Sequence, residues 1–220
     1  MILMTQNAIL PMTEDIATRV AQRTLAQRRA DYTDEVRRLL DAALDVMRTR
    51  GTESRPRVAD IVAAAELSND AFYRHFPSKD ALVAALLEDG TERLHGYLEH
   101  QMAKEPTPQG KVRRWVDGVL AQTDAAVGDT TRAVLFNAGG VADGRASGRH
   151  PASGVLATLL HEPLAALGSA DPQLDAAFVT HAVMGVLADH LWSRTRPSRK
   201  EADRIVNLCV GAAKPSTVRR

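Results

Sequence analysis

The sequence predicts an all-α fold, and three features of its 220 residues support this prediction. Apolar residues recur at intervals of three and four positions over most of the chain, which is the spacing of an amphipathic helix. Residues that cap helix N-termini, mainly Ser, Thr and Asp, precede several of these segments. No part of the sequence shows the alternation of apolar and polar residues that is typical of a half-buried strand.

An N-terminal extension, residues 1–30, precedes the first strongly amphipathic segment. Residues 12–30 have a helical pattern that is too polar for a core helix, and residues 16–30 contain four arginines and no acidic residue. Local positive charge of this kind suits a phosphate-binding surface. A solvated helix face explains it equally well.

Three helices follow the extension. They are predicted over residues 34–49, 58–65 and 69–75. Thr33 or Asp31 is the expected N-cap of the first helix, and Gly51 is its expected end. Ser68 is a good N-cap for the third helix, and Pro77 stops that helix.

The remaining chain predicts a second helical domain. Its helices are expected over residues 79–98, 112–120, 131–137, 152–167, 172–192 and 198–212. Pro163 is expected to kink or split the fourth of these helices, and the Gly-rich stretch 139–151 has the composition of a loop. The last two helices begin with strong capping signals, which are Asp171 before a proline and Ser198 with Glu201.

The predicted helix over residues 172–192 has two apolar stripes. The first consists of Leu174, Phe178, His181, Met184, Ala188 and Leu191, and the second of Val179, Ala182, Val183, Val186 and Leu187. A helix that is apolar on most sides must be covered on most sides. The cover is either its own domain or another subunit.

The composition excludes several classes of protein. Hydrophobic residues make up 45 % of the chain and charged residues 25 %, as in soluble globular proteins, so a membrane protein is not expected. Cys209 is the single cysteine, so no internal disulfide can form. Residues 1–10 lack the features of a secretory signal. We therefore expect a cytoplasmic protein in which Cys209 is a packed apolar side chain.

Residues 57–79 carry the functional motif. Two short helices joined by a tight turn, the second of them exposed, form a helix-turn-helix, which presents side chains to the major groove of DNA. The string over residues 64–82 resembles the signature of the TetR family, and it keeps both identity and spacing at Ser68, Tyr73, Phe76, Ser78, Lys79 and Leu82. The resemblance covers residues 31–87.

The resemblance implies two domains and a function. An N-terminal three-helix DNA-binding domain would be followed by a C-terminal helical domain that binds a ligand and dimerises. The expected segments are an extension at 1–30, the DNA-binding domain at 31–79, the ligand-binding and dimerisation domain at 80–214 and a tail at 215–220. The implied function is that of a transcriptional repressor, which a small-molecule effector releases from a palindromic operator of double-stranded DNA.

The resemblance also implies contacts with DNA. Tyr73, His75 and Lys79 match residues that bind phosphates, and a phenol hydroxyl and an ammonium group at a helix N-terminus suit this role. The outward positions of the recognition helix are expected to read bases, with Asn69 on adenine and Arg74 on guanine or phosphate. The complete set of candidates is Arg57, Ser68, Asn69, Asp70, Ala71, Tyr73, Arg74, His75 and Lys79.

Three positions depart from the family pattern. Glu66 replaces the turn glycine, and a left-handed conformation there would cost about 1 kcal/mol relative to glycine. Ala71 replaces a frequent threonine, and its methyl group is expected to face a thymine. The helix before the turn begins with Arg57 and Val58 instead of a hydroxyl cap.

A homodimer and an effector pocket are the other expectations. One recognition helix buries too little surface for tight specific binding, so two copies are expected to share an operator. The helices over 172–192 and 198–212 are candidates for a four-helix bundle between subunits, with burial inside one subunit as the alternative. Candidate pocket residues are apolar positions with a few polar groups, namely Trp115, Phe136, Asn137, His161, Phe178, His181 and Met184.

Two other function classes stay open, an enzyme and a helical scaffold that binds only proteins. The sequence holds no phosphate-binding glycine loop after a strand, no metal-spaced Cys and His set and no nucleophile motif. We therefore expect no catalytic residue, no cofactor and no metal. The Arg-rich extension is either a solvated helix or an arm that reaches along DNA, as minor-groove arms do in other helix-turn-helix proteins.

Overall fold

A computed structural model describes residues 15–138 and 151–213 of the chain. Both tails and most of the Gly-rich stretch predicted as a loop lie outside these ranges. The described residues form ten α-helices and one short 3-10 turn, with no strand among them. The all-α prediction is confirmed.

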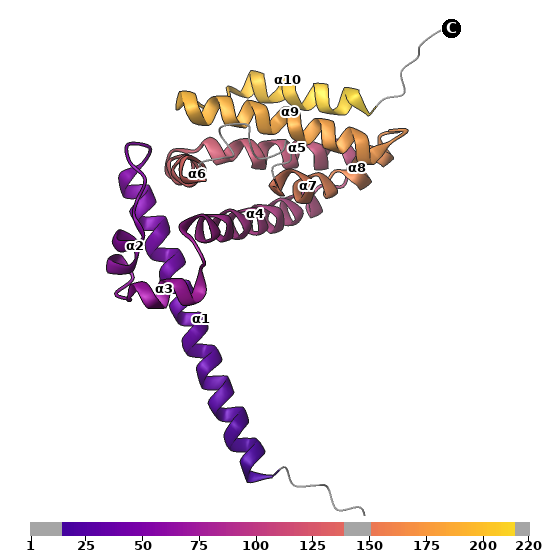
Figure 1. The fold of residues 1–220 in the computed structure, drawn as a ribbon. Helices are drawn as coiled ribbons and strands as arrows, with labels where there is room; N and C mark the ends of the chain where they lie inside the picture. The colour runs from indigo at the N-terminus through magenta and orange to yellow at the C-terminus, as the bar shows by residue number, and fades with distance from the viewer. Residues whose placement is uncertain (1–14, 139–150, 214–220) are drawn as a thin grey trace, which may run out of the picture.

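Helices α1 to α3 form an N-terminal head, and the helices from α4 onward form the body. Among the described α-helices, α1 is the longest with 35 residues and α8 the shortest with six. Their bounds are α1 (Ile16–Arg50), α2 (Val58–Ala64), α3 (Asn69–His75), α4 (Lys79–Ala103), α5 (Pro108–Leu120), η1 (Ala121–Thr123), α6 (Ala125–Asn137), α7 (Pro151–Thr158), α8 (His161–Ala166), α9 (Pro172–Ser193) and α10 (Arg199–Ala212). In the body, α4 forms one outer layer, α9 and α10 form the other, and the remaining helices lie between them (Figure 1).

Helix α1 is longer than predicted, because it continues through the extension as one helix of 35 residues. Thr33 and Asp31 therefore do not cap it. The Thr33 hydroxyl donates to the carbonyl of Arg29 at 2.8 Å, and the Asp31 carboxylate accepts from Gln27 at 2.8 Å, both within the helix. The packed half of α1 provides the helix nucleus. Further turns then form at little cost in free energy, because no proline or glycine interrupts residues 16–30. The predicted end at Gly51, which has φ +58°, is confirmed.

Two hydrophobic cores hold the molecule together. The head core joins α1, α2, α3 and the start of α4, and it also includes Ala133 and Val134 of α6. The body core is centred on Trp115 and Leu160 and reaches α9 and α10. Helix α6 therefore packs against both the head core and the body core.

The segment 152–167 was expected to be a helix that is either kinked or split at Pro163. It is split, into α7 and α8. The break lies at Leu159 and Leu160 rather than at Pro163, which sits in the first turn of α8. A proline there removes an N–H that has no partner within the helix anyway.

The structure confirms that Cys209 is a packed side chain. Cys209 is buried in the body core, and burial raises the pKa of its thiol to about 11, so the thiol stays protonated at neutral pH. It packs as a small apolar side chain.

In the described ranges, no helix has both the length and the apolar character that crossing a bilayer requires.

Candidate DNA-binding face and ligand cavity

The turn between α2 and α3 is built around Glu66. Its φ is +53°, so the residue that replaces the family's glycine does take the left-handed conformation. Arg38 of α1 donates to the carbonyls of Ala65 and Glu66, the latter at 3.1 Å. These bonds satisfy carbonyls at the end of α2 that would otherwise lack a partner, and so they offset the strain of the turn.

Helix α3 presents one face to solvent and one to the head core. The Ser68 hydroxyl caps it by accepting from the N–H of Ala71 at 3.1 Å, and Phe72 is fully buried beneath it. The exposed positions are Asn69, Asp70, Tyr73 and Arg74. These four side chains therefore face solvent, and their contacts with DNA stay a prediction.

Ala71 is an exception to that prediction. Only 4 % of its surface is exposed, so its methyl group packs in the head and is not available to a thymine. The reason is the helical period: at 100° per residue, position 71 shares the inward side of α3 with Phe72 and His75.

His75 is a second correction. Its side chain is 0 % exposed, so it cannot bind a phosphate as the family resemblance implied. The Nε2 atom lies 2.6 Å from Oε2 of Glu35, and the ring meets Tyr32 edge-on at 4.1 Å between centroids. His75 instead fastens α3 to α1.

Glu35 belongs to the site, although no motif in the sequence points to it. The same carboxylate oxygen, Oε2, accepts from Arg74 at 2.6 Å and lies 2.6 Å from His75. These hydrogen bonds, first that of His75 and then that of Arg74, lower the pKa of Glu35 below its usual 4.5. Glu35 thus positions Arg74 on the exposed face of α3, across 39 residues of sequence.

Glu35→Gln is expected to lower the melting temperature at pH 7, because the neutral amide loses the attraction of the carboxylate for its two partners. The folded-state pKa of Glu35 lies below 4.5, so the stabilisation is present above pH 4.5 and is lost as the pH falls through the folded value. Thermal melts from pH 7 to pH 3 should show the difference between variant and wild type shrinking at the acid end. Asp34→Asn, at an exposed ion pair with Arg37, is the control; a pH-independent difference for Glu35→Gln would refute this role.

Lys79 and Arg57 lie on either side of α3 in the sequence, at the starts of α4 and α2. Lys79 is the first residue of α4, and its ammonium group donates to the carbonyl of Pro56 at 3.2 Å. Arg57 is the N-cap of α2, its backbone N–H donates to Asp60 at 2.7 Å, and its side chain is exposed. Both side chains lie at the ends of helices that flank α3, so phosphate contacts from them stay a prediction.

A cavity of about 220 Å³ lies between α4, α6 and α9, and α1 closes one side of it. Aliphatic and thioether side chains form most of the lining, together with polar groups from α4, η1 and α6. The apolar lining is Leu44, Leu86, Leu87, Leu94, Val134, Leu135, Leu156, Met184, Leu187 and Leu191; the rest is Asp89, Gly90, Thr91, Arg93, Gln122, Thr130 and Thr131.

Of the predicted pocket residues, only Met184 lines this cavity. Trp115 and Asn137 are core residues: the indole N–H of Trp115 donates to the carbonyl of Leu156 at 3.0 Å, and the Asn137 amide donates to Ala133 at 2.9 Å. Phe136 lies under the guanidinium of Arg55, 5.4 Å from the ring centroid.

The other three candidates also lie outside the cavity lining. His161 begins α8, and Phe178 and His181 are exposed on α9. Spacing along a helix shows which residues share a face, but not what that face meets. The lining residues of α6, such as Thr131 and Leu135, therefore had no signal that sequence reasoning could use.

A comparison with protein families finds a match in the segment that contains the helix-turn-helix. Residues 39–86, which include α2, α3 and parts of α1 and α4, match the family model described as "Bacterial regulatory proteins, tetR family". The helix-turn-helix segment of this chain therefore matches the TetR family. A search of curated proteins finds no match to it.

Solved structures resemble the fold of this chain at low sequence identity. A TetR-family regulator from Mesorhizobium loti is 16 % identical with a TM-score of 0.61, covering 83 % of this chain and 96 % of its own. One from Pectobacterium atrosepticum is 22 % identical with a TM-score of 0.58, covering 84 % and 92 %. The regulator FadR from Bacillus subtilis, solved in complex with stearoyl-CoA, is 12 % identical with a TM-score of 0.53, covering 80 % and 96 %.

The outer layer formed by α9 and α10 has an uncovered apolar face. The exposed large apolar residues of α9 and α10 are Leu174, Phe178, Trp192 and Leu208. Two apolar faces on α9 were predicted, and both exist, but Leu191 is turned inward and Ala182 outward, opposite to the predicted stripes. The inner face of α9 packs on the body core, and the outer face has no cover among the residues that the structure describes.

Proposed function

We propose that this TetR-family regulator is a homodimeric repressor, which binds a palindromic operator through α3 and is released when a small molecule fills the cavity. The observation that supports it best is the position of the cavity. Its lining includes Leu44 of α1 and Leu86 of α4, and both residues belong to or pack against the head core. A ligand there touches the head and the body at once.

The recognition face has the chemistry for the first part of this function. The Asn69 amide can pair with adenine, and the Arg74 guanidinium with guanine or phosphate. Tyr73 is exposed next to them, and its hydroxyl can donate to a phosphate. Phosphate contacts fix the register of the protein, while contacts to base edges supply specificity.

The uncovered face of α9 and α10 supports a dimer. Two antiparallel helices from each subunit would form a four-helix bundle around Phe178 and Leu208, which are exposed on the single chain. Gly185 has open space around it, so a partner helix can approach closely there. A dimer places two copies of α3 on the two halves of a palindrome.

The lining of the cavity indicates the class of effector. No aromatic side chain occurs among the described lining residues, and hydroxyl and amide groups of Thr131 and Gln122 stand among aliphatic ones. A cavity of about 150 Å³ holds a benzene-sized ligand, so about 220 Å³ suits a compact aliphatic molecule with one hydrogen-bonding group. Such a ligand releases DNA only if it binds better to the arrangement of heads that does not fit the operator.

Lys79→Ala is expected to weaken binding to all DNA sequences alike and to flatten the slope of log affinity against log salt by about one unit for each phosphate that Lys79 neutralises. The operator is first found by selecting DNA bound by the wild type, starting from the region upstream of its own gene. Titrations at several salt concentrations then compare the variant with Lys200→Ala, an exposed lysine on α10.

The selection of bound DNA can support or refute the proposed function. Sequence-specific, salt-dependent retention of DNA separates a regulator from a scaffold that binds only proteins. If the wild type selects no sequence above background, the proposed function is wrong. If Lys79→Ala weakens only some sequences, Lys79 reads bases instead of positioning the protein.

Met184→Trp is expected to abolish the response to effectors while leaving operator binding intact. The larger side chain takes up part of a cavity of about 220 Å³, and the space that is left no longer matches the shape of a ligand that fits the wild type. Operator release is measured with a panel of medium-chain aliphatic acids, alcohols and lactones. Val155→Trp, at an exposed position of α7, should respond as the wild type does; a Met184→Trp protein that still responds would place the effector elsewhere.

A further inference from the structure

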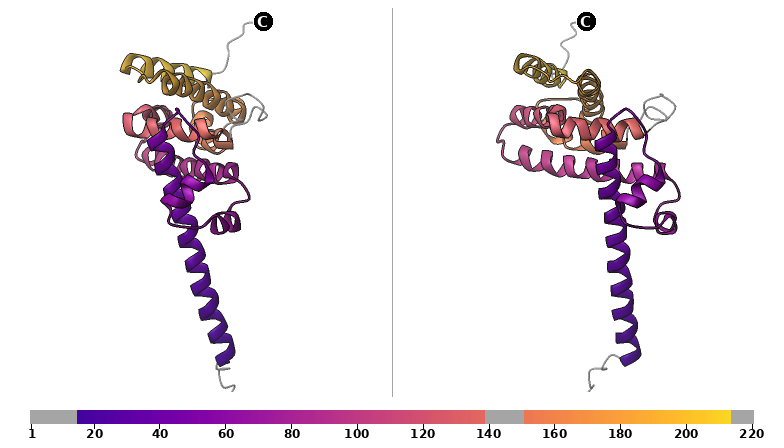
Figure 2. Two further views of the ribbon diagram at one scale, coloured as in Figure 1. Left: turned by 60° about the vertical axis from the view of Figure 1, so that its left-hand side comes forward. Right: turned by 90° about the vertical axis from the view of Figure 1, so that its left-hand side faces the viewer.

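The first turns of α1 form a projecting arm, residues 16–30. Tyr32 and Glu35 of α1 touch the end of α3 just beyond these turns, so the arm begins where the head ends. Figures 1 and 2 show that it runs beyond α3, on the side of the head that lies away from the body, in all three views. At 1.5 Å per residue, its 15 residues extend about 22 Å past the recognition helix.

The arm is strongly basic, and no salt bridge neutralises its charge in the part of the chain that the structure describes. Its arginines are Arg19, Arg23, Arg28 and Arg29, and no acidic residue occurs between Asp15 and Asp31. Every residue of the arm is exposed. Exposed arginines elsewhere do have a carboxylate partner, as Arg37 and Arg48 later in α1 and Arg93 of α4 show.

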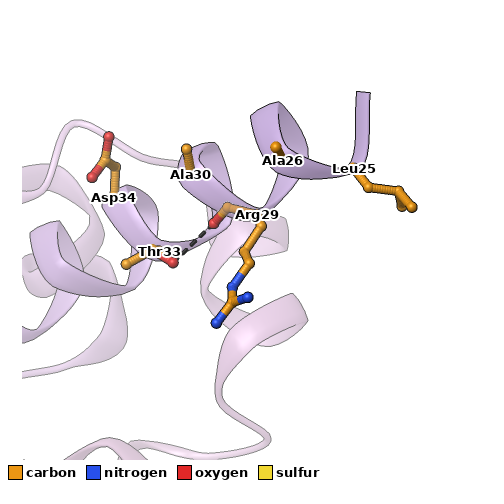
Figure 3. Close-up of a pocket in the computed structure, with 6 residues that line it drawn as sticks. All are labelled: Leu25, Ala26, Arg29, Ala30, Thr33 and Asp34. Atoms are coloured by element: carbon orange, nitrogen blue, oxygen red, sulfur yellow. Dashed lines mark hydrogen bonds between the residues drawn. The ribbon is translucent and has the colours of Figure 1, made fainter. Parts of the chain in front are cut away.

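One side of the arm combines charge with small side chains. At 100° per residue, Arg19, Arg23 and Arg29 fall within about one third of the circumference. Ala26 and Ala30 lie between them, and they line a shallow, open groove along α1, which ends at Asp34 (Figure 3). Small side chains beside arginines let a sugar-phosphate backbone approach the helix closely while the guanidinium groups reach its oxygens.

The apolar residues of the arm do not favour a membrane surface. Ile16 and Val20 lie on one side, and Leu25 lies about half a turn away from Ile16. A helix that binds in the plane of a membrane needs a continuous apolar face. The charge and the direction of the arm therefore point to the polyanion that α3 is proposed to bind.

We propose that the arm is a second DNA-binding element, which binds phosphates of the backbone outside the half-site contacted by α3. The proposal rests on the proposed function, because it requires that α3 binds DNA. Each subunit of a dimer would add one arm, so an operator complex would cover flanking DNA on both sides. Such contacts carry no base specificity, and they add affinity that depends steeply on salt.

The test replaces Arg19, Arg23, Arg28 and Arg29 with glutamine in the full chain. The control replaces Lys104, Lys111, Arg113 and Arg114 with glutamine, which removes the same four charges from α5 and its surroundings in the body. Circular dichroism verifies that both variants remain helical. Affinity is measured over a range of salt on the selected operator, once with long flanks and once trimmed to the two half-sites.

On the long DNA, the arm variant is expected to bind at least about tenfold more weakly at physiological salt. Its salt slope should be flatter by about 4 to 5 units, because the two arms of the dimer would no longer neutralise roughly four to six phosphates. The control variant should keep the salt slope of the wild type. Trimming the flanks of the DNA should lower the affinity of the wild type to that of the arm variant on the long DNA.

An arm variant with the wild-type slope, or a control that flattens equally, would overturn the proposal. So would a trimmed operator that binds the wild type as tightly as the long DNA does. Failure of the wild type to bind any DNA would instead count against the proposed function.

Discussion

Operator affinity is expected to fall at least about 100-fold when Phe178 and Leu208 are both replaced by glutamate. Their side chains are 64 % and 67 % exposed on the single chain, at the outer surface of α9 and α10. In a four-helix bundle between two subunits, each glutamate would bury an unpaired charge, which costs several kcal/mol. A monomer retains one α3 and loses the second half-site, and specific affinity depends on both.

Sedimentation and DNA titration on the same samples test this prediction. The wild type should sediment as a dimer at micromolar concentration, and the double variant as a monomer that keeps its helical content. The control replaces Val127 and Val155 with glutamate, two exposed valines on α6 and α7. If the double variant remains a dimer, the interface lies elsewhere; if it is a monomer that binds the operator normally, two linked heads are not required.

Trp115→Ala is expected to lower the free energy of unfolding by about 3 to 5 kcal/mol, the usual cost of removing a large buried aromatic side chain. The indole is fully buried at the centre of the body core, and its N–H donates to the carbonyl of Leu156. Trp115→Phe fills part of the space and leaves that carbonyl without its donor, so a smaller loss of about 1 to 3 kcal/mol is expected.

Denaturant unfolding of both variants, followed by far-UV circular dichroism, measures these losses. His181→Ala, at an exposed position of α9, should change stability little. The comparison separates a core residue from a ligand contact, which is the role that Trp115 was expected to have. A Trp115→Ala protein with wild-type stability and a weaker effector response would restore that expectation.

The two corrections in the site, at His75 and Ala71, have different causes. His75 matches the family signature as well as Tyr73 does, yet its ring is buried against Glu35 and Tyr32. Nothing in the neighbourhood of His75 in the sequence indicates this partner, which lies 40 residues away. Ala71 was misplaced for a simpler reason, since its position on α3 follows from the helical period once Phe72 is known to face inward.

The features that the sequence by itself determined are local ones. The all-α class, the turn at Glu66, the cap at Ser68 and the end of α1 at Gly51 depend on backbone preferences and capping within a few residues. The helix-turn-helix follows from the same short-range signals, together with a signature that lies in one continuous segment.

Only the tertiary structure decided which faces meet. In the structure, Trp115 is a core residue and Phe178 is exposed. The cavity is formed by residues of α1, α4, α6 and α9 that are far apart in the sequence. The structure also shows that the extension is the start of a single α1, supported by the packed half of that helix. Packing between distant segments depends on the shape of both surfaces, and helical spacing describes each surface without its partner.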